Sequence, residues 1–347
     1  MSLSRLRPLA LALLAGGSLA CARTPPEPPN LVVIVVDTLR ADHLGAYGYA
    51  PPTSPTIDGL AERGALFEAA YSTAAYTRPS TASILTGHYP SVHGAVTHAD
   101  SIGPGIATLA ERLQGAGYRT AGFYRNGNVG PRFGFARGFD EYVGVEKRHR
   151  RERRRRGEGA GAAEKNSETG DWLVAEAAIP ALDAFRKDRA ETGRPFFLYL
   201  HLADPHDPYT PPRDVLSGFL DGPLLPELEL FYTQPRSAMT ENPSVLRRLT
   251  TGQLPWRPNT LEQIVALYDA EIAASDAVIG RVLGHLESLG LAEETVVVVT
   301  SDHGEELFER GNSGHGHSHF EEQLHVPLVI AGAGVERRRI RGPVSLI

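Results

Sequence analysis

Four short apolar stretches constrain the fold of this sequence more than any other feature. They cover residues 31–36, 195–202, 295–300 and 326–331. The first reads Leu-Val-Val-Ile-Val-Val and lacks the polar alternation of a half-exposed strand. Such runs are typical of strands in a parallel sheet that helices cover on both faces. They therefore predict an α/β protein.

Helical patterns lie between these runs, at residues 56–63, 106–115, 171–189 and 261–289. Alternation of strands and helices predicts an α/β/α sandwich around a central mixed, mostly parallel sheet. The composition agrees, because 41% hydrophobic and 22% charged residues in a chain of 347 are typical of a globular domain. A net charge of −6 gives no basic field, so we expect no nucleic-acid partner.

Two segments fall outside this alternation. Residues 147–156 carry eight basic side chains and one histidine, and we expect a solvated, partly disordered surface loop, with contact to anionic lipid or a polyanionic substrate as the alternative. Residues 217–258 are rich in Pro and Leu without clean periodicity. We interpret them as an irregular insertion that could line the substrate entrance.

The N-terminus predicts export. Arg5 and Arg7 precede an apolar run at residues 9–15 that is too short to span a bilayer, so residues 1–20 are typical of a signal peptide. The sole cysteine, Cys21, follows Ser-Leu-Ala, an order that resembles a bacterial lipobox with serine where leucine is usual. An ordinary signal peptide is the alternative. We predict a lipid-anchored protein of the bacterial cell envelope, facing the periplasm or the outer surface.

Proline-rich residues 21–29 predict an extended tether between this anchor and a catalytic domain at residues 30–347. A single cysteine permits no disulfide within the chain.

Polar residues follow three of the apolar runs. Asp37 follows the first, Asp204 and His206 the second, and Asp302 with His303 the third. Ligands of open α/β sheets bind beyond the carboxyl ends of strands, so these side chains should meet there. A buried carboxylate is costly without compensation, and a lone Asp37 would be interpreted as a turn residue. Together with Asp302 and His303, it predicts a site for a divalent metal ion.

A second polar segment runs from Thr77 to Gly87. Pro79 suits the first turn of a helix, and Gly87 suits its end. Thr77 would then lie at the helix N-terminus, where free amides and the helix dipole favour an oxyanion. A simple capping role for Thr77 uses the same geometry.

These segments resemble the signatures of the sulfatase family of the alkaline-phosphatase superfamily. The resemblance rests on residues 29–45, 53–58, 77–90 and 301–305, which occur in the family's order and cover nearly the whole chain from Asn30 onward. Agreement over several ordered motifs is far more specific than any single motif. In relatives, the segment that corresponds to residues 343–347 leads into a smaller C-terminal subdomain, which we expect to be missing here.

The resemblance implies roles for individual residues. Asp37, Asp302 and His303 match metal ligands, and Thr77 matches the nucleophile that also contacts the metal. His206 matches a histidine that contacts the transferred group or the leaving oxygen.

Two further positions match less sharply. Asn126 or Asn128 falls near a substrate-binding lysine of the family, and His315 or His317 falls near a second one. Spacing does not decide within either pair.

The sequence departs from the family at two positions. Typical sulfatases have Cys or Ser at the Thr77 position, which is converted to formylglycine, and Arg at the Thr81 position. Threonine cannot form that aldehyde, and a sulfated threonine lacks the elimination route by which the aldehyde hydrate releases sulfate. A phosphorylated threonine can be cleaved by water at phosphorus. We therefore favour a phosphate ester or phosphodiester over a sulfate ester.

The predicted function is metal-dependent hydrolysis of phosphate, phosphodiester or sulfate esters. One divalent ion is expected, with Ca, Mg, Mn and Zn all compatible with the ligands. The substrate would be a small-molecule, glycan or lipid ester, and His206 or a histidine of residues 314–318 would protonate the leaving oxygen. The alternatives are a non-catalytic sulfatase-like binding protein or fragment, and a phosphotransferase acting on envelope lipid or polymer.

Overall fold

The computed structural model describes residues 27–155, 170–232 and 244–347. Its strands are β1 Asn30–Val36, β2 Ala65–Phe67, β3 Ala70–Tyr71, β4 Arg119–Tyr124, β5 Glu141–Gly144, β6 Phe196–Leu202, β7 Thr295–Ser301, β8 Glu306–Leu307, β9 Ser313–Gly314, β10 His325–Val326, β11 Leu328–Gly332, β12 Arg338–Ile340 and β13 Val344–Ser345. Its helices are α1 Pro55–Arg63, α2 Thr77–Thr86, α3 Pro90–His93, α4 Leu109–Gly115, α5 Val145–Arg155, α6 Trp172–Thr192, α7 Arg213–Leu216, α8 Pro226–Tyr232, α10 Val245–Thr250, α11 Thr260–Ser288 and α12 Glu321–Leu324.

The central sheet has eight strands in the order β12-β2-β11-β7-β1-β6-β4-β5. Parallel pairing joins β7, β1, β6, β4 and β5, whereas β11 runs antiparallel to both of its neighbours. The predicted mixed, mostly parallel sheet is confirmed. The three apolar runs that precede the polar residues form β1, β6 and β7, which are adjacent, so their carboxyl ends share one edge.

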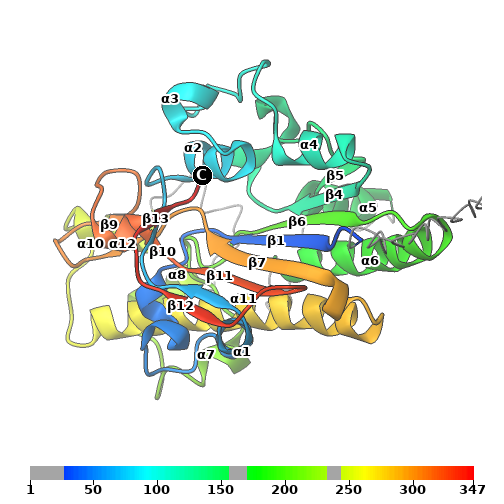
Figure 1. The fold of residues 1–347 in the computed structure, drawn as a ribbon. Helices are drawn as coiled ribbons and strands as arrows, with labels where there is room; N and C mark the ends of the chain where they lie inside the picture. Colours follow the sequence, from blue (N-terminus) through cyan, green and yellow to red (C-terminus); the bar gives the residue numbers. More distant parts are fainter. Residues whose placement is uncertain (1–26, 156–169, 233–243) are drawn as a thin grey trace, which may run out of the picture.

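Helices cover both faces of this sheet (Figure 1). Alternate side chains of β1 reach opposite faces: Val32, Ile34 and Val36 join the core under α1, α6 and α11, and Val33 and Val35 join the core under α2 and α4. Burial on both faces explains why the strand sequence shows no polar alternation.

The fourth apolar run was wrongly interpreted as one strand. Pro327 divides residues 326–331, because proline has no N–H to donate to a strand ladder. Before it, β10 pairs with β3 in a small sheet, and after it, β11 pairs with β7 and β2 in the central sheet. The short strands β2, β4, β5 and β12 have no comparably long apolar run and were not predicted.

The basic run was also wrongly interpreted, since residues 147–155 form most of helix α5. Arg and Lys are good helix formers, and Arg148 pairs with Glu152 one turn later at 3.7 Å. Buried Val145 begins the helix at the sheet. Exposed Lys147, Arg150 and Arg151 agree with the predicted solvation. Arg156 and the stretch that follows it, to residue 169, lie outside the described residues.

Within the described residues of the expected irregular insertion, 217–232 and 244–258, lie the short helices α8 and α10. Their apolar side chains join the main core: Leu228, Phe231, Tyr232, Val245, Leu246 and Leu249. The described part of this segment is therefore packed on the body of the domain.

No helix in the described ranges is both long and apolar enough to cross a membrane. The predicted signal peptide and Cys21 lie outside those ranges, so they stay predictions.

Candidate active site

The candidate site begins where β1 and β7 end side by side. These strands pair in register up to Val36 and Ser301, so the next residues, Asp37 and Asp302, emerge at neighbouring positions. Asp37 N also donates to Leu202 O at 3.1 Å, which brings in the end of β6. The sheet itself thus gathers polar residues from distant parts of the chain.

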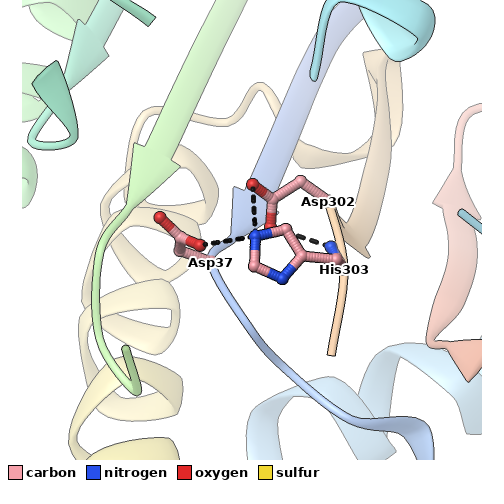
Figure 2. A group of neighbouring side chains, drawn as sticks. All are labelled: Asp37, Asp302 and His303. Atoms are coloured by element: carbon pink, nitrogen blue, oxygen red, sulfur yellow. Dashed lines mark hydrogen bonds and ion pairs between the residues drawn. The ribbon is translucent and has the colours of Figure 1, made fainter. Parts of the chain in front are cut away.

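Asp37, Asp302 and His303 form a compact group in which none is exposed (Figure 2). One ligand atom from each lies within 4.8 Å of the others. His303 Nε2 is 3.4 Å from Asp37 Oδ1 and 3.7 Å from Asp302 Oδ2. The predicted metal ligands are therefore brought together.

Within the described part of the chain, two carboxylate oxygens of this group have no hydrogen-bond donor. They are Asp37 Oδ1 and Asp302 Oδ2, both buried. The other oxygen of Asp302 accepts from His303 N at 2.9 Å and from Thr38 N at 3.4 Å, which aims Oδ2 into the group. Buried polar atoms without partners are rare because each costs free energy. These orphaned oxygens fit a bound cation.

The pKa directions support this interpretation. Burial and the charge of Asp37 raise the pKa of Asp302 well above its ordinary value. Burial and His315 lower the pKa of His303 to about 3, so its imidazole is neutral and can donate a lone pair. Burial acts to raise the pKa of Asp37, but His201, His206 and His303 outweigh it and keep the pKa low. A divalent cation would stabilise the ionised form of both acids.

Thr77 faces this group. It is the first residue of α2, which ends at Gly87 with φ 68°, as predicted. Its Oγ1 lies 3.4 Å from His303 Nε2. The hydroxyl therefore points to the candidate metal ligands, and only 1% of the residue is exposed.

The structure separates Asn126 from Asn128. Asn126 Nδ2 donates to Asp37 Oδ2 and lies 3.4 Å from Thr77 Oγ1. Asn128 Oδ1 instead accepts from Arg78 at 3.2 Å, and its carbonyl accepts from the same guanidinium at 3.1 Å. Asn126 is thus in the site, and Asn128 anchors Arg78 outside it.

The structure separates His315 from His317 in the same way. The ring of His315 lies 4.5 Å from that of His303 and 4.8 Å from that of His206, between centroids. Its Nδ1 is 3.0 Å from Glu305 Oε1. His317 Nε2 instead lies 3.0 Å from Glu306 Oε2. His315 and His206 therefore lie beside the candidate metal ligand His303, whereas His317 does not.

Two buried residues of the site were not predicted. His201 on β6 has Nε2 3.7 Å from Asp37 Oδ2, and its Nδ1 is 2.9 Å from Tyr199 Oη. Glu305 accepts from Tyr209 Oη at 2.7 Å with the oxygen that does not meet His315. A histidine inside the apolar run 195–202 was the available signal for His201.

A second buried charge cluster lies beside the site, around Arg125. Its guanidinium is 2.7 Å from Asp204, 3.5 Å from Asp171 and 3.0 Å from Glu146. Asp171 also accepts from the backbone amides of Ala203 and Asp204. Arg125 precedes Asn126 directly, and Asp204 stands two residues before His206, so this cluster holds two loops of the site.

Comparison with solved structures confirms the fold. The phosphonate monoester hydrolase of Agrobacterium radiobacter matches with a TM-score of 0.69 at 22% identity, over 92% of this chain and 71% of that one. A protein of the alkaline phosphatase superfamily from Vibrio parahaemolyticus matches with a TM-score of 0.60 at 18% identity, over 92% and 64%. The fold is therefore alkaline-phosphatase-like.

Sequence comparison also identifies the family of the chain. An uncharacterized sulfatase of Escherichia coli, YidJ, is 26% identical over an alignment of 340 positions that covers 92% of this chain. The chain spans just under two thirds, 66%, of the length of that relative. A sequence model named Sulfatase matches residues 29–347, a range that includes both strand-end aspartates and the helix that starts at Thr77. The chain thus belongs to the sulfatase family.

Proposed function

We propose that this protein is a metal-dependent ester hydrolase with Thr77 as its nucleophile. The observation that carries the proposal is the 3.4 Å approach of Thr77 Oγ1 to His303 Nε2, beside two buried carboxylate oxygens without donors. A serine or threonine hydroxyl is a weak nucleophile unless a base or a metal activates it. Membership of the sulfatase family is consistent with this chemistry.

Asp37, Asp302, His303 and Thr77 would hold one divalent ion, and Ca, Mg, Mn and Zn all suit such a set of oxygen and imidazole ligands. The ion would supply charge to lower the pKa of the Thr77 hydroxyl and to polarise the ester. Asn126 Nδ2, which already reaches Thr77 and Asp37, would donate to an oxygen of the transferred group.

Thr77 attacks phosphorus or sulfur in this proposal, and the ester bond to the alcohol breaks. The N-terminal amides of α2 stabilise the charge that develops on the transferred group. His206 or His315 gives a proton to the leaving oxygen. Burial acts to lower the pKa of His206, but Asp37 and Glu305 outweigh it and raise the pKa above its ordinary value, which favours the protonated donor. Water then releases the group from Thr77.

Chemistry at the nucleophile favours a phosphate ester or phosphodiester. The resemblance implies that sulfate release needs formylglycine, which threonine cannot form. Phosphothreonine, in contrast, is open to in-line attack by water at phosphorus.

Parallel assays with aryl phosphate, bis-aryl phosphate and aryl sulfate in Mg, Mn, Ca and Zn test the proposal. We expect turnover of a phosphorus ester and its loss in Thr77→Ala. Thr86→Ala is the matched control, because Thr86 lies on the same helix at its far end and its hydroxyl donates to Ala82 O at 2.6 Å. Acid quenching during turnover should trap phosphate on Thr77, detectable by mass spectrometry.

Normal turnover in Thr77→Ala would refute the nucleophile. Metal binding without turnover of any of these esters would favour a non-catalytic binding protein, and transfer of the group to an added alcohol would favour a phosphotransferase.

We also propose export to the cell envelope and lipid attachment at Cys21, on the strength of the N-terminal sequence alone. Expression in a bacterial host with labelled palmitate should label the wild type in the membrane fraction. Cys21→Ser should be unlabelled and recovered in the soluble fraction. Equal recovery of both proteins in the soluble fraction would contradict the anchor.

A further inference from the structure

A pocket of about 250 Å³ adjoins the candidate active site on the side of α2. Two of its wall residues are chain neighbours of site residues, since Tyr76 precedes Thr77 and Gly316 follows His315. The lining residues are Thr73, Ala74, Ala75, Tyr76, Pro79, Pro90, Val96, Gly316, Ser318 and His319. Thr77 and His315 of the candidate site are thus each one residue along the chain from the wall of this pocket.

The walls of the pocket are held in place by contacts within the protein. Gly316 has φ +80°, and a Cβ built on it would lie 3.7 Å from Tyr76 Cβ. The loop of residues 314–318 therefore packs directly on the segment before α2. Gly316 N donates to Gln323 Oε1 at 3.0 Å, and Gln323 is fully buried. The ring of Tyr76 also rests against His98, with centroids 4.6 Å apart. The pocket is therefore largely preformed.

The lining is partly apolar and partly polar, and Tyr76 Oη and Ser318 Oγ have no hydrogen-bond partner among the described residues. Ala74, Ala75, Pro79, Pro90 and Val96 contribute aliphatic surface. Among the described residues of the lining, none is Lys, Arg, Asp or Glu. A second anionic group on the alcohol would meet no Lys or Arg side chain in this lining, and burying a charge without a partner is costly.

The volume limits the size of the occupant. Pockets for drug-sized ligands usually measure about 300–1,000 Å³, and this one lies below that range. It has room for a single ring.

We propose that this pocket is the subsite for the alcohol part of the ester, and that it selects a single ring without a second anionic group. The inference rests on the proposed function and specifies its substrate class. Val96 sits at the pocket and is 48% exposed, so a larger side chain there can fill the pocket without entering the core.

Val96→Trp tests the subsite with phenyl and methyl esters of the same acid. We expect kcat/KM for the phenyl ester to fall by about 10-fold or more, since a ring that loses its pocket loses binding in the transition state. The methyl ester, which does not reach the pocket, should change by less than about 2-fold. The matched control is Val92→Trp, because Val92 lies on α3, is 54% exposed and does not line the pocket.

Val96→Arg places a positive charge at the pocket and should have an effect of the opposite sign. Relative to the wild type, the variant should raise the ratio of kcat/KM for a carboxyphenyl ester to kcat/KM for the phenyl ester by about 3-fold. This is the size of effect expected from a partly exposed ion pair. Comparing each variant with the wild type on the same ester removes differences in leaving-group chemistry.

The outcomes separate the two proposals. Wild-type turnover combined with equal effects of Val96→Trp on phenyl and methyl esters, or no effect on either, would overturn the subsite alone. Absence of wild-type turnover with every ester would overturn the proposed function and the subsite with it.

Discussion

Two groups of buried acids lie at the same edge of the sheet, and they are compensated in different ways. Around Arg125, the guanidinium lies within 3.5 Å of Asp171 and Asp204. Around His303, the described residues supply no such cation, and Asp37 Oδ1 and Asp302 Oδ2 have no donor. The first cluster carries its own counter-charge, and the second requires one from outside.

This difference separates a structural role from a ligand-binding role among residues of similar burial. Asp171 is as buried as Asp302, at 0% exposure, so burial alone does not identify the functional acid. The presence or absence of a counter-charge within the described residues does identify it. Glu271 near Arg125 also has one oxygen without a donor among the described residues, but it belongs to no group of acid and imidazole side chains there that could share an ion.

The largest expected effect is on activity. Asp302→Asn should lower kcat/KM by more than about 100-fold, because it removes a direct ligand, and even groups that only support a ligand cost about 10–100-fold. Asp171→Asn is the matched change in the other cluster and should cost less than about 10-fold. Steady-state kinetics with the best ester measures both, and equal losses would remove the distinction between the clusters.

The next effect is on stability and has opposite signs in the two clusters. Arg125→Met should lower the free energy of unfolding by about 3–5 kcal/mol, because buried Asp171 loses the guanidinium that compensates its charge. In metal-free protein, Asp302→Asn should leave that free energy unchanged or raise it, since it removes repulsion from Asp37. Urea unfolding in chelator measures both, and a large loss in metal-free Asp302→Asn would contradict our interpretation.

Added metal should act on one cluster only. At about 100 times its Kd, a divalent ion should stabilise the wild type by about 2.7 kcal/mol. The same ion should shift the melting temperature of Asp302→Asn little, whereas Arg125→Met should keep the shift although its baseline is lower. Thermal melts with and without the ion make the comparison. A wild-type melting temperature that does not respond to any of the four metals would argue against the site.

The smallest expected effect is a pH dependence of the Arg125 cluster. Burial and the charge of Asp204 raise the pKa of Asp171 to about 7. A carboxyl whose pKa is raised on folding holds its proton in the folded state, so its contribution lowers stability as the pH rises from about 4 to about 7. Between pH 6 and pH 7 the loss should be about 1 kcal/mol. Metal-free unfolding should show this slope in the wild type and a weaker one in Asp171→Asn, and identical slopes would contradict it.

Much of the fold was predictable because buried strands have a local signature. The runs that became β1, β6 and β7 and the helix from Thr77 to Gly87 were apparent from residue type alone. The polar residues that follow these strands could then be predicted to lie together, since parallel strands end at a common edge of the sheet. Short strands such as β4 and β5 were missed because so few residues show no clear pattern of apolar side chains. The basic run forms helix α5 because Arg and Lys are good helix formers and the helix begins at buried Val145.

The sequence by itself determined the α/β class, the family signatures and the metal-ligand candidates Asp37, Asp302 and His303. Only the tertiary structure decided between Asn126 and Asn128 and between His315 and His317. Each pair is two residues apart in a loop, where no periodicity fixes the direction of a side chain. Distant partners fix it instead: Arg78 holds Asn128 and Glu306 holds His317 away from the site, and Asp37 and Glu305 hold Asn126 and His315 in it.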